Sequence, residues 1–289
     1  MKLAVFGAAG QLGAALARVA AQRGVAISGF DRAAADITDP RAVFAALAAA
    51  GADVAVNAAA YTAVDKAESE PQAAFAVNRD GAENVAAAAS RAGIPVIHVS
   101  TDYVFDGTKK GAYVEDDPIA PLGVYGKSKA EGEAAVRDAN ARAVILRTAW
   151  VYGLEGANFV KTMLRLGGER EVLRVVDDQR GCPTFADDLA DGIVSIAGKL
   201  GAGWGTYHLT GSGETTWFGF ARAIFAEASR LGARVPRLEP ITTADYPTPA
   251  KRPANSVLAC VKVKGAFGVE LPPWNDGLSR MLHAHLGAK

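Results

Sequence analysis

The sequence has few cysteines and no excess of either charge. Its two cysteines, Cys182 and Cys260, form no CxxC pair, and we expect both to be free thiols. Lysine plus arginine and aspartate plus glutamate both number 31, so the chain offers no general basic surface for a nucleic-acid backbone. These features predict a protein of a reducing compartment that does not bind nucleic acid.

Long apolar runs are also missing. No stretch approaches the roughly 20 apolar residues that a membrane-spanning helix needs. The apolar start of the chain is interrupted by Gly7 and Gly10 and is too short for a secretory signal. We therefore expect a cytoplasmic protein without a membrane anchor.

Half of the 289 residues are hydrophobic, which is enough for one large domain or two lobes. The first half alternates apolar runs with alanine-rich segments. Strands are expected at residues 2–6, 25–30, 53–57, 94–99 and 143–147, and helices at 14–22, 40–50, 71–92 and 124–139. Such continuously apolar strands are typical of a parallel sheet covered on both faces. The sequence thus predicts an α/β fold with a Rossmann-type doubly wound parallel sheet.

Three glycines, Gly7, Gly10 and Gly13, separate the first expected strand from the first helix. Glycine permits a tight turn there and lets backbone N–H groups approach a pyrophosphate at the helix N-terminus. Asp31 ends the second strand, where a carboxylate can hold the adenosine ribose. Packing alone can also require such glycines. Together these features favour a dinucleotide-binding domain at residues 1–152, to which some later chain returns, and a smaller mixed α/β substrate-binding lobe mainly at 153–289.

Tyr125 and Lys129 are four residues apart and share one face of the helix expected at 124–139. A nearby ammonium lowers a tyrosine pKa from about 10, so that the phenol can exchange a proton with a substrate oxygen. Ser100-Thr101-Asp102 closes the fourth strand at the carboxyl edge of the sheet, where ligands bind. A surface tyrosine beside a solvated lysine remains the alternative.

In this order, the glycine loop, Asn57-Ala58-Ala59-Ala60, Ser-Thr-Asp and YxxxK are similar to the extended short-chain dehydrogenases. The resemblance to the dTDP-4-dehydrorhamnose reductases is closer and runs nearly end to end. It rests on Ala60-Tyr61-Thr62-Ala63-Val64-Asp65-Lys66-Ala67-Glu68, Ser100-Thr101-Asp102-Tyr103-Val104-Phe105, Arg147-Thr148-Ala149-Trp150-Val151-Tyr152, Asp177-Asp178-Gln179 through Cys182-Pro183-Thr184, and Pro247-Thr248-Pro249-Ala250-Lys251-Arg252-Pro253 with Asn255-Ser256.

The resemblance implies reduction of dTDP-4-dehydro-6-deoxy-L-mannose to dTDP-L-rhamnose with NADPH or NADH. Tyr125 would donate the proton, Lys129 would hold the nicotinamide ribose, and Thr101 would orient the sugar oxygen. The cofactor would contact Gly7, Gly10, Gln11, Leu12, Gly13, Asp31, Arg32, Asp36, Ile37, Ala60, Tyr61, Thr62, Val99, Tyr125 and Lys129. The sugar nucleotide would contact Thr101, Asp102, Tyr125, Trp150 and Arg252.

One position departs from the family's pattern. Some members form a dimer around a divalent metal held by glutamates, one from the segment matching Asp187 and one from the C-terminal helix. The second position is Ala284 here. We therefore predict no metal, and a monomer and a homodimer both stay open.

Two other interpretations compete with a reductase. One is a nucleotide-sugar 4-epimerase or 4,6-dehydratase, although dehydratases usually follow the strand-end threonine with Asp-Glu, and Tyr103 follows Asp102 here. The other is a non-catalytic subunit similar to the regulatory subunit of methionine adenosyltransferase. Retention of Thr101, Tyr125 and Lys129 favours the enzyme.

Overall fold

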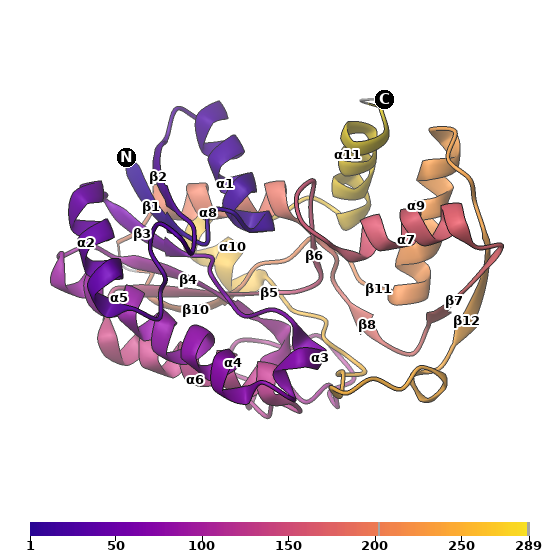
Figure 1. The fold of residues 1–289 in the computed structure, drawn as a ribbon, viewed down its shortest axis with the longest axis horizontal. Helices are drawn as coiled ribbons and strands as arrows, with labels where there is room; N and C mark the ends of the chain where they lie inside the picture. The colour runs from indigo at the N-terminus through magenta and orange to yellow at the C-terminus, as the bar shows by residue number, and fades with distance from the viewer. Residues whose placement is uncertain (202, 288–289) are drawn as a thin grey trace.

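The computed structural model describes residues 1–201 and 203–287 and is built on a six-stranded parallel sheet (Figure 1). Its strand order is β2-β1-β3-β4-β5-β10. The strands are β1 (Lys2–Phe6), β2 (Ala26–Phe30), β3 (Val54–Asn57), β4 (Val96–Thr101), β5 (Ala143–Thr148) and β10 (Gly205–His208). Because β2 and β3 flank β1, the chain changes direction across the sheet there, and ligands bind at such a point. The predicted α/β fold with a parallel sheet is confirmed.

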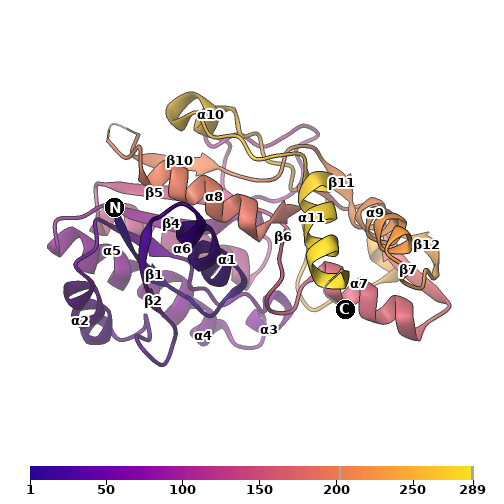
Figure 2. The same cartoon turned by 90° about the horizontal axis from the view of Figure 1, so that it is seen from above.

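Helices cover both faces of the sheet (Figure 2). One face carries α1 (Gln11–Gln22), α8 (Ala186–Ala197) and α10 (Val261–Phe267), and the other carries α2 (Pro40–Ala50), α5 (Ala82–Arg91) and α6 (Val124–Ala139). Leu3 and Val5 of β1 belong to the first core, and Ala4 and Phe6 to the second, so the strand is apolar throughout. No helix in the described ranges is long and apolar enough to cross a membrane.

A second group of elements lies to the right in Figure 1 and encloses its own core around Phe220, Ile224 and Met281. It contains α7 (Phe159–Glu169), α9 (Trp217–Arg230), α11 (Trp274–Leu286) and three strand pairs, namely β7 (Val172–Val176) with β12 (Arg237–Ile241), β6 (Val151–Tyr152) with β9 (Thr184–Phe185), and β8 (Arg180–Gly181) with β11 (Thr215–Thr216). Between these segments, α8 and β10 return to the first sheet. The assignment of dinucleotide binding to residues 1–152 and of substrate binding mainly to residues 153–289 stays a prediction.

The long helix expected at 71–92 is interrupted. Helix α4 (Pro71–Phe75) continues into a π-helical turn, η1 (Ala76–Gly81), before α5 begins. Buried Asn78 in this turn accepts a hydrogen bond from the Tyr61 N–H at 2.8 Å and donates to the Tyr61 carbonyl at 3.1 Å and the Ser128 hydroxyl at 3.0 Å. π-Turns often occur at functional sites. This one holds Tyr61 of the loop after β3 in place.

Candidate active site

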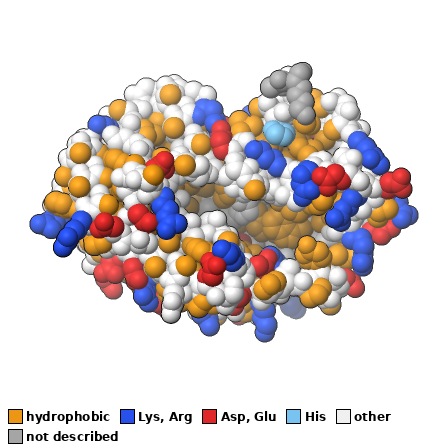
Figure 3. Space-filling view, in the orientation of Figure 1, with side chains coloured by type: hydrophobic (Ala, Val, Ile, Leu, Met, Phe, Trp, Pro, Cys, Tyr) orange, Lys and Arg blue, Asp and Glu red, His pale blue; other side chains and the backbone are white. Residues whose placement is uncertain are grey.

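A cleft of about 730 Å³ opens along the carboxyl edge of the sheet, within the usual size range of small-molecule sites. Figure 3 shows it as a hollow with an apolar floor between the two parts of the molecule. Most predicted site residues line it, namely Gly7, Gly10, Gln11, Leu12, Asp31, Arg32, Asp36, Ile37, Ala60, Tyr61, Thr62, Val99, Thr101, Asp102, Tyr125, Lys129 and Trp150. Two predicted residues, Gly13 and Arg252, lie outside this lining.

The glycine loop is shaped by close backbone approaches. Gly7 has φ +85°, and a Cβ on it would lie 2.6 Å from the Ala59 nitrogen. A Cβ on Gly13 would lie 2.2 Å from the Gly7 carbonyl oxygen, so Gly13 acts by packing beneath the loop. Gly10 caps α1, and no described side chain accepts the N–H groups of its first turn. This end of α1 therefore fits a pyrophosphate, which those N–H groups and the helix dipole would bind.

Tyr125 and Lys129 both face the cleft from α6. Lys129 is buried, and Tyr125 is partly exposed to the cleft. The Lys129 Nζ donates a hydrogen bond to the Val99 carbonyl at 2.6 Å. Burial raises the pKa of Tyr125 to about 12, although a hydrogen bond with Thr101 opposes this, and burial lowers the pKa of Lys129 to about 8. The expected lowering of the tyrosine pKa by Lys129 is therefore not what the structure has, because burial disfavours the phenolate. A protonated phenol at neutral pH is the state that a proton donor needs.

Two buried oxygen atoms in the cleft have no hydrogen-bond partner among the described residues. They are Oδ2 of Asp102 and Oγ1 of Thr148. Asp102 Oδ1 accepts from the Thr101 hydroxyl at 2.9 Å, and burial raises the pKa of Asp102 to about 6. An unpaired buried polar atom costs about 1–3 kcal/mol. Both atoms are therefore placed to bind polar groups of a ligand.

Two tryptophans form one wall of the cleft. Trp150 and Trp217 stack in parallel, with ring centroids 3.5 Å apart and planes inclined by 6°. Trp150 follows β5, Trp217 begins α9, and both line the cleft. Trp150 has φ +48° and is the one non-glycine residue with positive φ in the described ranges. Such backbone strain persists where the surrounding structure holds it, often at functional sites.

Arg252 lies beside the cleft and forms a forked ion pair with Asp65 of α3 (Val64–Ala67). Its Nη2 lies 2.8 Å from Asp65 Oδ2, and its Nη1 lies 3.1 Å from Asp65 Oδ1. The guanidinium holds the pKa of Asp65 below its usual value. A ligand phosphate would have to compete with this carboxylate for Arg252.

The family model described as RmlD substrate binding domain matches residues 1–286. A Sinorhizobium fredii protein named dTDP-4-dehydrorhamnose reductase is 47% identical over 291 residues, covering 99% of this chain and 98% of that protein. The chain belongs to the dTDP-4-dehydrorhamnose reductase family. The resemblance seen in the sequence is thereby confirmed, and the chain is a member of a family of oxidoreductases.

Solved structures of the dTDP-4-dehydrorhamnose reductase family have the same fold. The structure from Clostridium acetobutylicum has a TM-score of 0.93 at 38% identity, covering 98% of this chain and 99% of that one. The structure from Bacillus anthracis, solved in complex with NADP, has a TM-score of 0.91 at 37% identity with the same coverage. The overall fold is thus shared with a relative whose structure was solved with NADP bound.

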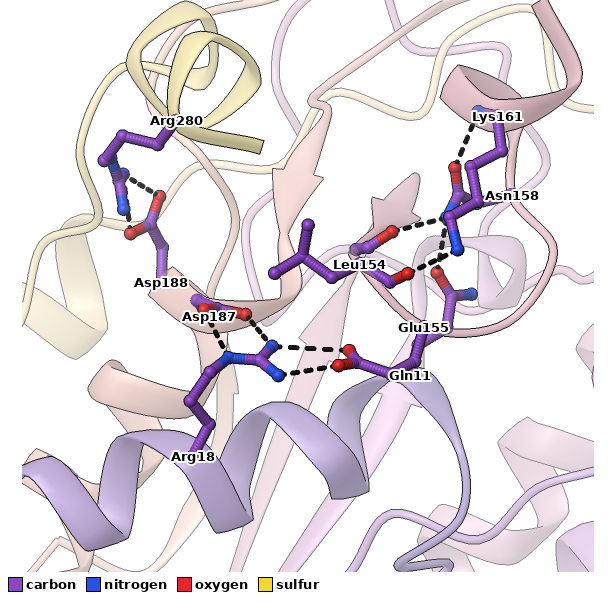
Figure 4. Close-up of polar contacts among 10 residues, drawn as sticks. Gln11, Arg18, Leu154, Glu155, Asn158, Lys161, Asp187, Asp188 and Arg280 are labelled. Atoms are coloured by element: carbon purple, nitrogen blue, oxygen red, sulfur yellow. Dashed lines mark hydrogen bonds and ion pairs between the residues drawn. The ribbon is translucent and has the colours of Figure 1, made fainter. Parts of the chain in front are cut away.

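The acidic pair that opens α8 does not fit the metal of some dTDP-4-dehydrorhamnose reductases, because arginines already hold it (Figure 4). Arg18 Nη2 lies 2.6 Å from Asp187 Oδ1, and Arg18 Nη1 lies 2.7 Å from Glu155 Oε1. Arg280 bonds both oxygens of Asp188, at 2.8 and 2.7 Å. A divalent ion needs several oxygen ligands and would have to displace both guanidinium groups. The described residues include no cluster of three or more potential metal ligands.

Several cleft residues escape the sequence analysis. Thr148 carries a recognisable signal, because it ends β5 directly beside Thr101 of β4 in the sheet register. Trp217 carries none, since nothing along the chain links it to Trp150. Outside the cleft lining, Arg18 meets Glu155 and Asp187 only through tertiary packing.

Proposed function

We propose that this chain reduces dTDP-4-dehydrorhamnose (dTDP-4-dehydro-6-deoxy-L-mannose) to dTDP-L-rhamnose with NADPH or NADH. The observation that carries the proposal is the meeting of Thr101, Tyr125 and Lys129 beside the glycine loop, in a chain of this reductase family. The relative from Sinorhizobium fredii is named for this activity, and the Bacillus anthracis structure holds NADP. Both support the assignment of reaction and cofactor.

In the proposed reaction NAD(P)H, when bound, supplies a hydride to the keto carbon. The Tyr125 phenol donates its proton to the keto oxygen, and the Thr101 hydroxyl hydrogen-bonds the same oxygen. Hydride and proton together convert the ketone to an alcohol, and the Tyr125 phenolate then regains a proton. General acid catalysis of this kind contributes about 10²–10⁴ in rate.

The remaining residues bind and orient. The N–H groups of Gly10, Gln11 and Leu12 would hold the pyrophosphate, and Asp31 the adenosine ribose. Lys129 would hold the nicotinamide ribose. Apart from Gly13, which packs beneath the glycine loop, the other predicted cofactor contacts line the same cleft, namely Gly7, Arg32, Asp36, Ile37, Ala60, Tyr61, Thr62, Val99 and Tyr125.

The sugar nucleotide would occupy the part of the cleft near the second lobe. The unpaired oxygen of Asp102 would accept a hydrogen bond from a sugar hydroxyl. The stacked indoles of Trp150 and Trp217 offer a flat apolar face to a ring of the sugar nucleotide. Arg252 would bind the diphosphate by a forked, charge-assisted contact. Thr148 adds a second hydroxyl at the reacting end.

The direct test is NADPH oxidation with a panel of 4-keto nucleotide sugars. We expect turnover with dTDP-4-dehydrorhamnose. A 4-epimerase or dehydratase would instead convert a sugar nucleotide without net consumption of the cofactor. A chain that turns over no sugar nucleotide, but binds a synthetase tightly, would support the non-catalytic subunit.

Choice between NADH and NADPH is expected to depend on Asp31 and Arg32. Asp31 can accept both ribose hydroxyls of NADH but repels a 2′-phosphate, whereas the guanidinium of Arg32 suits that phosphate. The Arg32 side chain is 87% exposed and pairs with Asp36 at 3.0 Å, so it is free to turn. We expect Arg32→Ala to raise the KM for NADPH about three- to tenfold with little change for NADH.

Asp31→Ala is expected to do the reverse and raise the KM for NADH. Steady-state kinetics with both cofactors provide the measurement, and Arg41→Ala, an exposed arginine outside the cleft lining, serves as the control. Equal changes in the KM for NADH and for NADPH would mean that neither residue distinguishes the 2′-hydroxyl of NADH from the 2′-phosphate of NADPH.

Arg252→Ala is expected to weaken binding of dTDP about tenfold or more, because a charge-assisted contact contributes about 1.5–3 kcal/mol. Binding of NADPH should be weakened less, because Arg252 is held by Asp65 of α3 and not by the glycine loop that would bind the cofactor. Calorimetry with dTDP and with NADPH measures both, and Lys251→Ala, its exposed neighbour, is the matched control. A larger loss for NADPH than for dTDP would contradict this role.

Turnover is expected to need no divalent metal, because Arg18 and Arg280 already neutralise Asp187 and Asp188. Treatment with EDTA followed by dialysis should leave both the rate of NADPH oxidation and the melting temperature unchanged. Added magnesium should change neither. Loss of activity on chelation that magnesium restores would refute the prediction.

We further propose that the protein acts in the cytoplasm. Cys182 and Cys260 are both free thiols, as the sequence predicts, which suits a reducing compartment. A monomer and a homodimer both stay open.

A further inference from the structure

A row of buried polar side chains runs beneath the candidate active site, from β3 through β4 to Lys129. The exposed fractions of Asn57, His98 and Lys129 are 0, 0 and 1%. Asn57 Nδ2 lies 3.2 Å from His98 Nδ1, and His98 Nε2 lies 3.3 Å from Lys129 Nζ. His98 therefore contacts the proposed catalytic lysine from the side away from solvent.

The direction of these hydrogen bonds is determined at the Asn57 end. The backbone N–H of Ala59 donates to Asn57 Oδ1 at 3.1 Å, so the amide oxygen is used and the NH2 group faces the imidazole. Because an amide NH2 only donates, His98 Nδ1 must accept, and the imidazole proton lies on Nε2. The reverse orientation of Asn57 would place its NH2 against the Ala59 N–H, with two donors face to face.

The Nε2–H of His98 consequently points at Lys129 Nζ. That nitrogen also donates to the Val99 carbonyl at 2.6 Å. A free amine has two N–H groups and one lone pair, so it can donate to Val99, donate toward the cleft and accept from His98. An ammonium has three donors and would set one of them against the His98 N–H.

Other charges around Lys129 oppose this preference only in part. Glu133, one turn further along α6, favours the ammonium. Its carboxylate, however, accepts hydrogen bonds from Arg147 at 2.7 and 2.8 Å and from the Ser100 hydroxyl at 2.6 Å. Burial lowers the pKa of Lys129, and burial together with Lys129 keeps the pKa of His98 well below its usual value, so the imidazole is neutral. The other titratable groups lining this end of the cleft are Asp102, Tyr103 and Tyr125.

We propose that His98 is a positioning residue of the site: oriented by Asn57, it donates from Nε2 to Lys129 and biases Lys129 toward the free amine. The consequence for catalysis rests on the proposed function, whereas the direction of the hydrogen bonds does not. A lysine that gains and loses a proton near neutral pH can return one to the Tyr125 phenolate in each turnover.

Imidazole ¹⁵N chemical shifts of the full chain test the tautomer without any substrate. The protein has 4 histidines, so a His98→Gln variant assigns the His98 signals by their disappearance. We expect a neutral ring protonated on Nε2 throughout about pH 6 to 8, where an ordinary histidine titrates. A proton on Nδ1, or an imidazolium in that range, would overturn the proposal.

The pH dependence of kcat/KM tests the effect on Lys129. Glutamine at position 98 can accept from Asn57 and donate to Lys129, whereas methionine fills the space without donating. In the profile of kcat/KM against pH, one limb reports the titration of Lys129. We expect His98→Met to move this limb to higher pH by about one unit, and His98→Gln to leave it in place. Equal shifts in both variants, or none in either, would refute the proposal. Absence of turnover with every sugar nucleotide would refute the proposed function but leave the ¹⁵N result intact.

Discussion

Tyr125→Phe is expected to lower kcat about 10²- to 10⁴-fold with dTDP-4-dehydrorhamnose, while the fold and the affinity for NADPH are kept. The phenylalanine ring preserves the edge-on contact with Tyr103, whose ring centroid lies 5.5 Å away. Only the hydroxyl is lost, and with it the proton donor. The measurement is single-turnover oxidation of NADPH, with NADPH affinity determined separately by titration.

Tyr207→Phe is the matched control, because it removes a buried hydroxyl that donates to the Gly203 carbonyl outside the cleft. Its turnover should be near normal. Since burial raises the pKa of Tyr125 to about 12, wild-type turnover should not fall through tyrosine ionisation at moderately alkaline pH. Near-normal turnover of Tyr125→Phe would exclude Tyr125 as the proton donor.

Arg147→Met is expected to destabilise the protein by about 3–5 kcal/mol, because it breaks a buried ion pair. The side chains of Arg147 and Glu133 are 2 and 0% exposed, and Arg147 Nη2 lies 2.7 Å from Glu133 Oε2. Removing the guanidinium leaves a buried carboxylate paired only weakly. Urea unfolding, followed by circular dichroism, measures the loss.

Arg137→Met is the corresponding control on the same carboxylate. The Arg137 side chain is 42% exposed, and its Nη1 lies 3.6 Å from Glu133 Oε2, so water screens the pair. Its loss of stability should stay below about 1 kcal/mol. Similar losses in the two variants would mean that burial of the Arg147–Glu133 pair has no special effect.

The first half of the fold is predictable because its signals are local. The expected helix at 40–50 coincides with α2, which Asp39 caps at the N-terminus and Gly51, with φ +55°, ends. The prediction of one continuous helix at 71–92 is wrong in its middle. A π-helical turn adds a residue there without changing the apolar face enough to be visible in the sequence, and the contacts of Asn78 with Tyr61 and Ser128 stabilise it.

The candidate site also has some features that are predictable from the sequence and others that are not. The glycine loop, the strand-end Thr101 and the Tyr125–Lys129 spacing are short patterns, and the sequence alone locates them at the correct ends of strands and helices. The ionisation of Tyr125, however, does not depend on nearby sequence alone. The pKa of Tyr125 is raised rather than lowered, because burial depends on residues from several elements packed around the phenol.

The sequence by itself determined the continuously apolar strands, the glycine turn that suits a pyrophosphate, and the family to which the chain belongs. Only the tertiary structure decided that Trp217 stacks on Trp150, that Arg18 bonds Asp187, and that His98 faces Lys129. The physical reason is range. Turns, caps and periodicity act over a few neighbouring residues, whereas these contacts join segments far apart in the sequence that only tertiary packing brings together.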